Sequence, residues 1–207
     1  MKMGRGGDGV TTSKAASPNL PATQSSHRNI VVLGIDPGLA TTGWGVVEKD
    51  SPPLLKGFGV IVTPANTPLP DRLLRIRCEL NQLFYKYQPD VMVIEELFFA
   101  KFAKSIAATA QARGAILCAA AEAGIPVIEY NPRAVKMAST GFGSASKIQI
   151  QSMVKAAFNM KELPRPDDAA DALAMALCHL QTNMFLKTSK KITPELAKAL
   201  AAVEGNQ

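Results

Sequence analysis

The chain has 207 residues, of which 47% are hydrophobic; this suits one folded domain with a single core and excludes wholesale disorder. Its apolar stretches are too short to span a bilayer, and its three scattered cysteines fit neither a disulfide framework nor a zinc site, which points to a reducing compartment. The net charge is +6, but basic residues outnumber acidic ones by three in residues 1–28 and by two in residues 184–207, so the rest of the chain is almost neutral.

Two stretches of this nearly neutral part contain basic residues and no acidic one. Residues 97–121 hold Lys101, Lys104 and Arg113, and residues 131–160 hold Arg133, Lys136, Lys147 and Lys155. Together these stretches predict a face that binds phosphate groups. Solvated helix surfaces would produce the same pattern, so charge alone leaves both interpretations open.

The first 28 residues are rich in Gly, Ser, Thr and Pro and show no apolar periodicity, which predicts a disordered tail. Their basic, acid-poor composition leaves an organellar transit peptide as the alternative. Short apolar runs then predict three closely spaced strands, at residues 30–36, 42–48 and 57–63, in an antiparallel meander. Apolar side chains at helical spacing predict a helix over residues 71–87, and a fourth strand follows at residues 91–95.

The second half of the chain alternates helices with one more strand. Helices are predicted at residues 101–123, 132–139, 146–158 and 167–181, with a strand at 126–130, a Gly-rich loop at 141–144 and a short helix at 194–203. Two strands reached through helical crossovers, added to three antiparallel strands, predict an α/β domain with a five-stranded mixed sheet flanked by helices. This domain is expected over residues 29–183, with residues 184–207 as a C-terminal extension.

Asp171 is the most informative acidic residue. Between Ala169 and Cys178 it is the only polar side chain of a helix that otherwise has the composition of a buried one, and no Lys or Arg lies within one turn. An ionised carboxylate there requires a partner, and a divalent cation, which prefers oxygen ligands, would supply one. Asp168 lies on the same helical face. It also lies where the helix begins, so helix capping remains an alternative for Asp168.

Asp36 and Glu95 each end an apolar strand. Ligand sites form at the carboxyl ends of strands in open α/β sheets, although an acid can also mark the point where a strand reaches solvent. Strand side chains alternate, so only one of Glu95 and Glu96 can join a shared site, and the pattern does not choose between them. Carboxylates converging from two strands and a helix would repel one another without cations, and two Mg²⁺ ions about 4 Å apart would complete a phosphoryl-transfer site.

At these residues the chain resembles the RuvC family of crossover junction endodeoxyribonucleases. The matching segments follow the family order within residues 29–183 and are Leu33–Gly38, Thr42–Gly45, Ile94–Phe98, Gln111–Gly114, Gly141–Lys147 and Asp168–Ala174. Sugar-kinase-like ATPases share the first segment, but they need two such domains and a second phosphate loop, which this chain does not contain. A non-catalytic DNA-binding module would keep the basic residues but would not need four acids.

The resemblance implies a ribonuclease-H-like fold and a homodimer that binds a four-way (Holliday) DNA junction and nicks symmetrically opposed strands. It selects Glu95 over Glu96, so that Asp36, Glu95, Asp168 and Asp171 would hold two Mg²⁺ ions per subunit, with Mn²⁺ able to substitute. It also implies that Lys147 and Lys136 assist catalysis and that an aromatic residue after the glutamate contacts the junction.

The remaining expectations combine this resemblance with the basic stretches. The candidate DNA contacts are Phe98 (with Phe99 as its rival), Lys101, Arg113, Arg133, Lys136 and Lys147. His179 lies eight residues beyond Asp171, off the expected metal face, and is interpreted as structural. The family further implies cooperation with the RuvA and RuvB branch-migration proteins, a place in the bacterial cytoplasm with the nucleoid, and no membrane.

Overall fold

The computed structural model describes residues 29–96, 103–131 and 146–189. The strands are β1 (Val31–Asp36), β2 (Thr41–Glu48), β3 (Leu54–Val62), β4 (Val91–Glu95) and β5 (Val127–Tyr130). The helices are α1 (Leu69–Tyr87), α2 (Ala103–Glu122), α4 (Lys147–Ala157) and α5 (Asp167–Ser189). The expected tail, the helix at 132–139, the loop at 141–144 and the helix at 194–203 lie outside the described residues.

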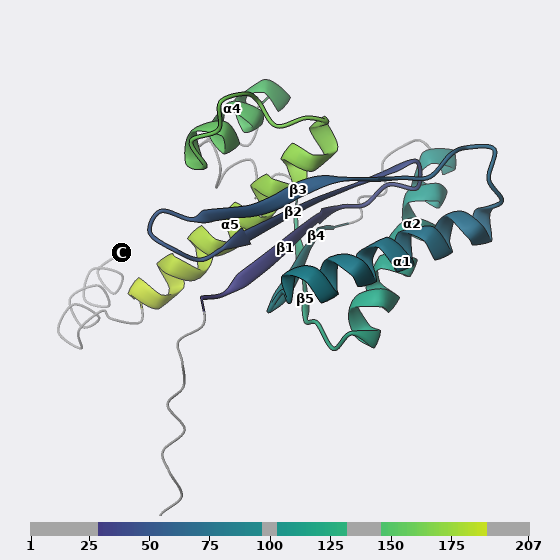
Figure 1. The fold of residues 1–207 in the computed structure, drawn as a ribbon, viewed down its shortest axis with the longest axis horizontal. Coiled ribbons are helices and arrows are strands. Elements are labelled where there is room, and N and C mark those ends of the chain that lie inside the picture. Colours follow the sequence, from purple (N-terminus) through teal and green to yellow (C-terminus); the bar gives the residue numbers. More distant parts are fainter. Residues whose placement is uncertain (1–28, 97–102, 132–145, 190–207) are drawn as a thin grey trace, which may run out of the picture.

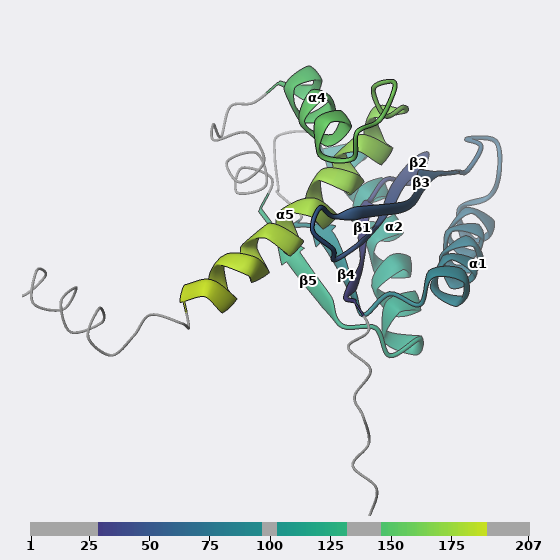
Figure 2. The ribbon, with the colours of Figure 1, turned by 60° about the vertical axis from the view of Figure 1, so that its left-hand side comes forward.

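The five strands form one mixed sheet in the order β3-β2-β1-β4-β5. β1 pairs with β2 and β2 with β3 in antiparallel fashion, whereas β4 is parallel to both β1 and β5. The predicted mixed sheet is therefore confirmed. Helices α1 and α2 cover one face, and α5, with α4 outside it, covers the other (Figures 1 and 2). None of the helices in the described ranges is both long and apolar enough to cross a membrane.

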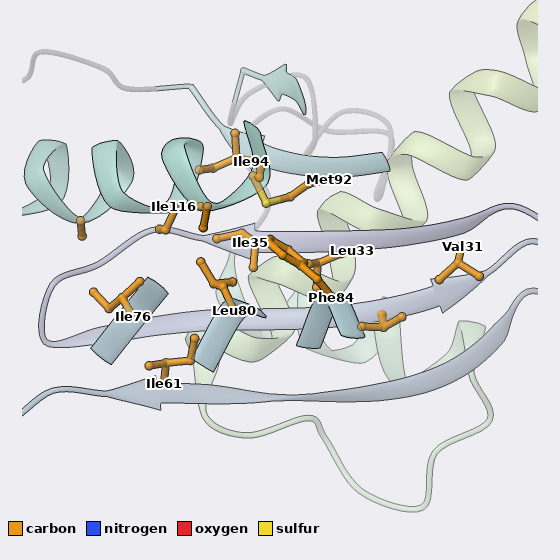
Figure 3. Close-up of a cluster of buried hydrophobic side chains, with 14 residues drawn as sticks. Val31, Leu33, Ile35, Ile61, Ile76, Leu80, Phe84, Met92, Ile94 and Ile116 are labelled. Atoms are coloured by element: carbon orange, nitrogen blue, oxygen red, sulfur yellow. The ribbon is translucent and has the colours of Figure 1, made fainter. Parts of the chain in front are cut away.

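One hydrophobic core lies between the sheet and the pair α1 and α2 (Figure 3). Alternate residues of β1 and β4 point into it, namely Leu33, Ile35, Met92 and Ile94. Helix α1 contributes Ile76, Leu80 and Phe84, which are spaced four residues apart and therefore lie on one face of the helix. The other residues of β1 and β4, including Val32 and Val93, belong to a second core on the α5 face.

Helix α5 lies directly on the backbone of β1 and β2. A Cβ atom at Gly34 would overlap the carbonyl oxygen of Ala172, and one at Gly43 would overlap the carbonyl group of Asp168. These glycines therefore allow a close backbone approach that any other residue would prevent. Because α4 covers the other side of α5, nearly every residue from Ala169 to Leu180 is buried, which explains the apolar composition of the helix.

Candidate active site

The alternation of side chains along the sheet places Asp36 and Glu95 on the α5 face. Val32 and Val93 of β1 and β4 belong to the core on that face, and Asp36 and Glu95 follow at even spacing from them. The parallel register pairs Ile35 with Ile94, so the two acids lie next to each other where the strands end. Glu96 is exposed, and its backbone N–H donates to the Tyr130 carbonyl at 2.8 Å. The geometry thus selects the glutamate that alternation alone could not.

The glycine contact with α5 brings the other two acids to the same end of the sheet. Gly43 is the β2 partner of Asp36 in the antiparallel register, and the backbone of Asp168 rests on Gly43. Asp171 lies one helical turn further along and is half-buried, whereas its neighbours Ala170 and Ala172 are fully buried. Asp168 lies in the first turn of α5, where its charge also favours the helix dipole. A role at the helix end and a role in the site are therefore compatible.

The electrostatics of Asp36 show that the four acids act on one another. Burial is the main cause that raises the pKa of Asp36 to about 7, from an ordinary value of 3.8. The negative charges of Glu95, Asp171 and Asp168 raise the pKa further, and Lys147 lowers it. Without a cation, Asp36 therefore holds its proton up to about neutral pH. Strongly perturbed carboxyl groups of this kind are typical of functional sites.

The donor set of this site suits a hard divalent cation, since carboxylate oxygens are the ligands that Mg²⁺ and Ca²⁺ prefer. Within the described ranges, no three Asp, Glu, His or Cys side chains are arranged to hold a metal ion as they stand. The electrostatic coupling nevertheless connects Glu95, Asp168 and Asp171 to Asp36, and it acts over longer distances than direct coordination. Four like charges repel one another, and a bound cation would favour a closer arrangement.

Lys147 lies at the N-terminus of α4 beside the acids. Its ammonium is 3.8 Å from Asp167 Oδ2, and the other oxygen of Asp167 accepts a hydrogen bond from Gln151 at 2.7 Å. Lys147, Arg165, Asp167 and Asp168 line an open hollow of about 530 Å³ together with Pro166. Our sequence reasoning missed Arg165, because a single basic residue between two prolines carries no pattern. Its position three residues before Asp168 was the only available signal.

The expected DNA contacts fall into two groups, those outside the described residues and those within them. Phe98, Phe99, Lys101, Arg133 and Lys136 lie outside the described residues. Arg113 is described, but its side chain is only 8% exposed and forms an ion pair with Glu129 at 2.7 Å. The structure therefore differs from our expectation for Arg113, because very little of its guanidinium is accessible to a DNA phosphate.

His179 lies on the buried side of α5 and is 4% exposed. Its Nδ1 is 2.9 Å from the Tyr130 hydroxyl, with which it forms a hydrogen bond, and burial lowers its pKa. A buried, neutral imidazole bonded to a tyrosine agrees with the structural role expected for this residue.

The fold matches solved structures of nucleases. This chain superposes on Thermus thermophilus RuvC in complex with Holliday junction substrate with a TM-score of 0.70 and 38% identity, covering 75% of this chain and 96% of that chain. The yeast mitochondrial Holliday junction resolvase Ydc2 superposes with a TM-score of 0.57 at 14% identity, covering 76% and 80% respectively, which reflects the fold alone. The sheet and its helices therefore define a ribonuclease-H-like protein.

Sequence comparisons identify the family within this class. The family model described as crossover junction endodeoxyribonuclease RuvC matches residues 32–179. The RuvC protein of Endomicrobium trichonymphae is 52% identical over 155 residues, covering 74% of this chain and 82% of that protein. That of Chloroflexus aggregans is 52% identical over 151 residues, covering 72% and 92%. This chain belongs to the RuvC family of crossover junction endodeoxyribonucleases.

Proposed function

We propose that this protein resolves four-way DNA junctions, during homologous recombination and repair, by nicking two symmetrically opposed strands. The observation that carries the proposal is the half-buried Asp36 carboxyl group at the strand ends, where it lies beside Glu95 and where three neighbouring acids help to raise its pKa to about 7. Converging acids repel one another in the absence of a cation, and they are the ligands that a cation-dependent phosphodiesterase requires. Membership of the RuvC family supports the same reaction and the same substrate.

RuvC-family enzymes are metal-dependent nucleases, and we assign the metal-binding role to Asp36, Glu95, Asp168 and Asp171. Mg²⁺ is the expected ion, with two per subunit and with Mn²⁺ able to substitute. Asp36 lies on the central strand beside Glu95, and it pairs with Gly43, on which the backbone of Asp168 rests, so it would be the ligand best placed to serve both ions. Divalent cations at such a site lower the pKa of bound water and stabilise charge on the leaving oxygen.

The reaction is hydrolysis of a DNA phosphodiester. The oxygen of water bonds to phosphorus, the bond between phosphorus and the 3′ oxygen breaks, and that oxygen leaves with a proton, giving 3′-hydroxyl and 5′-phosphate ends. Lys147 lines the hollow beside Asp168, so its charge can offset the charge that develops on the phosphate. Lys136 is proposed to assist it. Arg165 joins Phe98, Lys101 and Arg133 as a proposed DNA contact, because it lines the same hollow as Lys147.

The protein is proposed to act as a homodimer, since cutting two opposed strands requires two sites. RuvA and RuvB are the proposed partners that move the junction before it is cut, and the bacterial cytoplasm is the proposed location. The relatives described above support this location, since Endomicrobium and Chloroflexus are bacteria.

The test is incubation of the purified protein with an end-labelled synthetic four-way junction and with a linear duplex of matched sequence. Each substrate is tested with Mg²⁺, with Mn²⁺ and with EDTA, over several junction sequences. We expect paired nicks at symmetric positions in the junction alone and only with a divalent ion. Tight binding of the junction without nicks under every metal condition would contradict the proposal and would favour a non-catalytic junction-binding protein.

A further inference from the structure

Arg113 of α2 is the most deeply buried of the Lys, Arg, Asp and Glu residues in the described part of the chain, with 7% of its surface exposed. Its Nη1 donates a hydrogen bond to the backbone carbonyl of Glu95, and its Nη2 lies 2.7 Å from Glu129 Oε1. A buried guanidinium is stable only when its N–H groups are bonded and its charge is balanced. The charge of Arg113 is therefore already committed inside the protein.

The backbone directions of β1 and β4 explain why the Glu95 carbonyl needs an unusual donor. The N–H of Val31 donates to Asp90 Oδ2 at 2.8 Å, and the carbonyl of Val31 accepts from the Asp90 N–H at 2.9 Å. The backbone groups of Val31 thus turn toward β4, and by alternation so do those of residues 33, 35 and 37. Residue 37 is a proline, which has no N–H to donate.

The carbonyl of Glu95 lies opposite this missing donor. The N–H of Glu96 points to β5, where it donates to the Tyr130 carbonyl at 2.8 Å, so the backbone groups of Glu95, one residue earlier, point to β1. The parallel ladder of β1 and β4 would continue with a donor from Pro37, and Arg113 supplies the bond in its place. The side chain of Arg113 therefore completes the sheet at the residue that carries the Glu95 carboxylate.

We infer that Arg113 is a positioning residue: by bonding the Glu95 carbonyl and Glu129 together, it fixes the end of β4 against β5 and holds the Glu95 carboxylate in place for metal binding. This inference rests on the proposed metal-binding role of Glu95. Glu129 pairs with Ile94 in the β4–β5 register, so one guanidinium connects α2 to both strands. Partners of this kind, one step removed from a metal, affect metal affinity or activity by about 10–100-fold when they are lost.

The test compares four variants of the full chain. Arg113→Met removes both bonds, and Arg113→Lys keeps the charge but offers one compact donor group instead of a fork. Glu129→Gln removes the ion pair and keeps the bond to Glu95. Arg77→Met is the matched control, because it removes an exposed pair with Glu122 that also joins α2 to a neighbouring element. Circular dichroism and thermal melting check that each variant folds.

Three measurements distinguish positioning from DNA contact. The first is the rate of junction cleavage as a function of Mg²⁺ concentration, with Mn²⁺ binding followed by calorimetry. The second is the affinity for the junction in EDTA at several salt concentrations. The third is amide hydrogen exchange at residues 91–96 in the metal-free protein, which reports on the end of β4 without any catalysis or ligand.

For Arg113→Met we expect an Mg²⁺ requirement raised by about 10–100-fold, weaker Mn²⁺ binding and faster exchange at residues 91–96, with junction affinity and its salt dependence unchanged. The effects of Arg113→Lys should be intermediate and those of Glu129→Gln small, and Arg77→Met should behave as the unmutated protein does.

A weaker junction affinity with a salt slope reduced by about one, at an unchanged Mg²⁺ requirement, would overturn the inference in favour of a phosphate contact. If Arg113→Met does not fold, the same outcomes are read from Arg113→Lys. If the unmutated protein binds Mn²⁺ but does not cut the junction, the substrate proposed above is wrong. The Mn²⁺-binding and hydrogen-exchange measurements would still decide the role of Arg113.

Discussion

Asp36 is the residue at which the requirements of folding and of function conflict most directly. Burial and the three neighbouring acids oppose its ionisation, whereas Lys147 favours it. Metal binding requires the ionised carboxylate, so a bound cation must displace a proton that the metal-free protein holds up to about neutral pH. The same carboxyl group therefore destabilises the metal-free protein and, under the proposed function, is required for metal binding.

This conflict predicts how the stability of the metal-free protein changes with pH. The folded state retains the Asp36 proton up to a pKa of about 7, whereas the unfolded state releases it near 3.8. Between these values the folded state binds more protons, so its stability falls as the pH rises, by up to about 4 kcal/mol in total. Urea unfolding in EDTA from pH 4 to pH 8 measures this slope. If the dependence of stability on pH is the same for the wild type and for Asp36→Asn, the raised pKa of Asp36 is contradicted.

The substitution Asp36→Asn predicts opposite changes in stability and activity. Asparagine has almost the same shape but no charge to desolvate, so the metal-free variant should unfold at a higher urea concentration than the wild type at pH 8. Junction cleavage should fall below detection, because a neutral amide is a poor metal ligand. Asp50→Asn, at an exposed acid outside the site, serves as the control and should leave both measurements unchanged. Cleavage by a folded Asp36→Asn protein would refute the metal assignment.

Helix α5 carries two of the four acids, and its position is set by contact with the main chain of the sheet. The helix packs on three glycines of the sheet, Gly34, Gly43 and Gly45. A Cβ at Gly45 would lie 2.7 Å from the Leu173 side chain. Since Gly43 lies beneath Asp168 and pairs with Asp36, the glycine contact sets the distance between these two acids. Small changes in the seating of α5 should therefore reach the active site directly.

We expect Gly43→Ala to lift the start of α5 and to reduce junction cleavage by about 100-fold, since displacements near 1 Å at a reacting centre have effects of that size. The added methyl group should also cost about 1–3 kcal/mol of stability through overpacking. Gly114→Ala is the matched control, because no atom lies within 4 Å of a Cβ at that position in α2. It should be neutral, or stabilising by up to about 1 kcal/mol. Urea unfolding measures the stability of each variant, and the junction assay measures its cleavage rate. Equal cleavage rates for Gly43→Ala and Gly114→Ala would contradict the role given to Gly43.

The sequence predicted the order and type of the described elements, because each is encoded by local periodicity. The fourth strand was predicted at its observed bounds, Val91–Glu95, and the first helix to within two residues of its start at Leu69. β3 begins at Leu54, three residues before the prediction, because a register shift beside Val46 and Val47 lets Leu54 and Leu55 pair despite their irregular pattern. α5 extends to Ser189 rather than Gln181, since no glycine or proline marks an end there.

The four acids proposed for the site could also be chosen from local sequence patterns, but their arrangement could not. Asp171 stood out because it was the one acid within an apolar helix. The choice of Glu95 over Glu96 depends on which face of the sheet receives α5, and that follows from tertiary packing. The partners of Arg113 depend on the register of β4 with β5 and on the proline after β1, which lie far apart in the chain. A pattern of charges could therefore suggest Arg113 as a DNA contact without showing that it was buried.

The whole molecule is expected to work as a pair, because one active site can cut only one strand at a time. Sedimentation equilibrium should give a mass of about 44 kDa, twice the 22.0 kDa of the chain. α2 exposes Ala107 and Gly114, small residues that let another helix approach closely. Gly114→Arg should therefore yield a folded monomer, whereas Gly114→Ala should remain a dimer. A wild-type monomer at micromolar concentration would contradict the proposed assembly.

The main-chain contact beneath α5 also bears on how this protein can change during evolution. Both hydrophobic cores are built mostly from aliphatic side chains, and cores of this kind tolerate substitution when total volume is kept. At Gly34 and Gly43 the nearest atoms of α5 belong to its main chain, so substitutions elsewhere in the two cores can accumulate without altering the spacing of the acids. Core side chains can therefore change during evolution while the positions of the acids stay the same. Related proteins can then differ in most of their core residues and still perform the same chemistry.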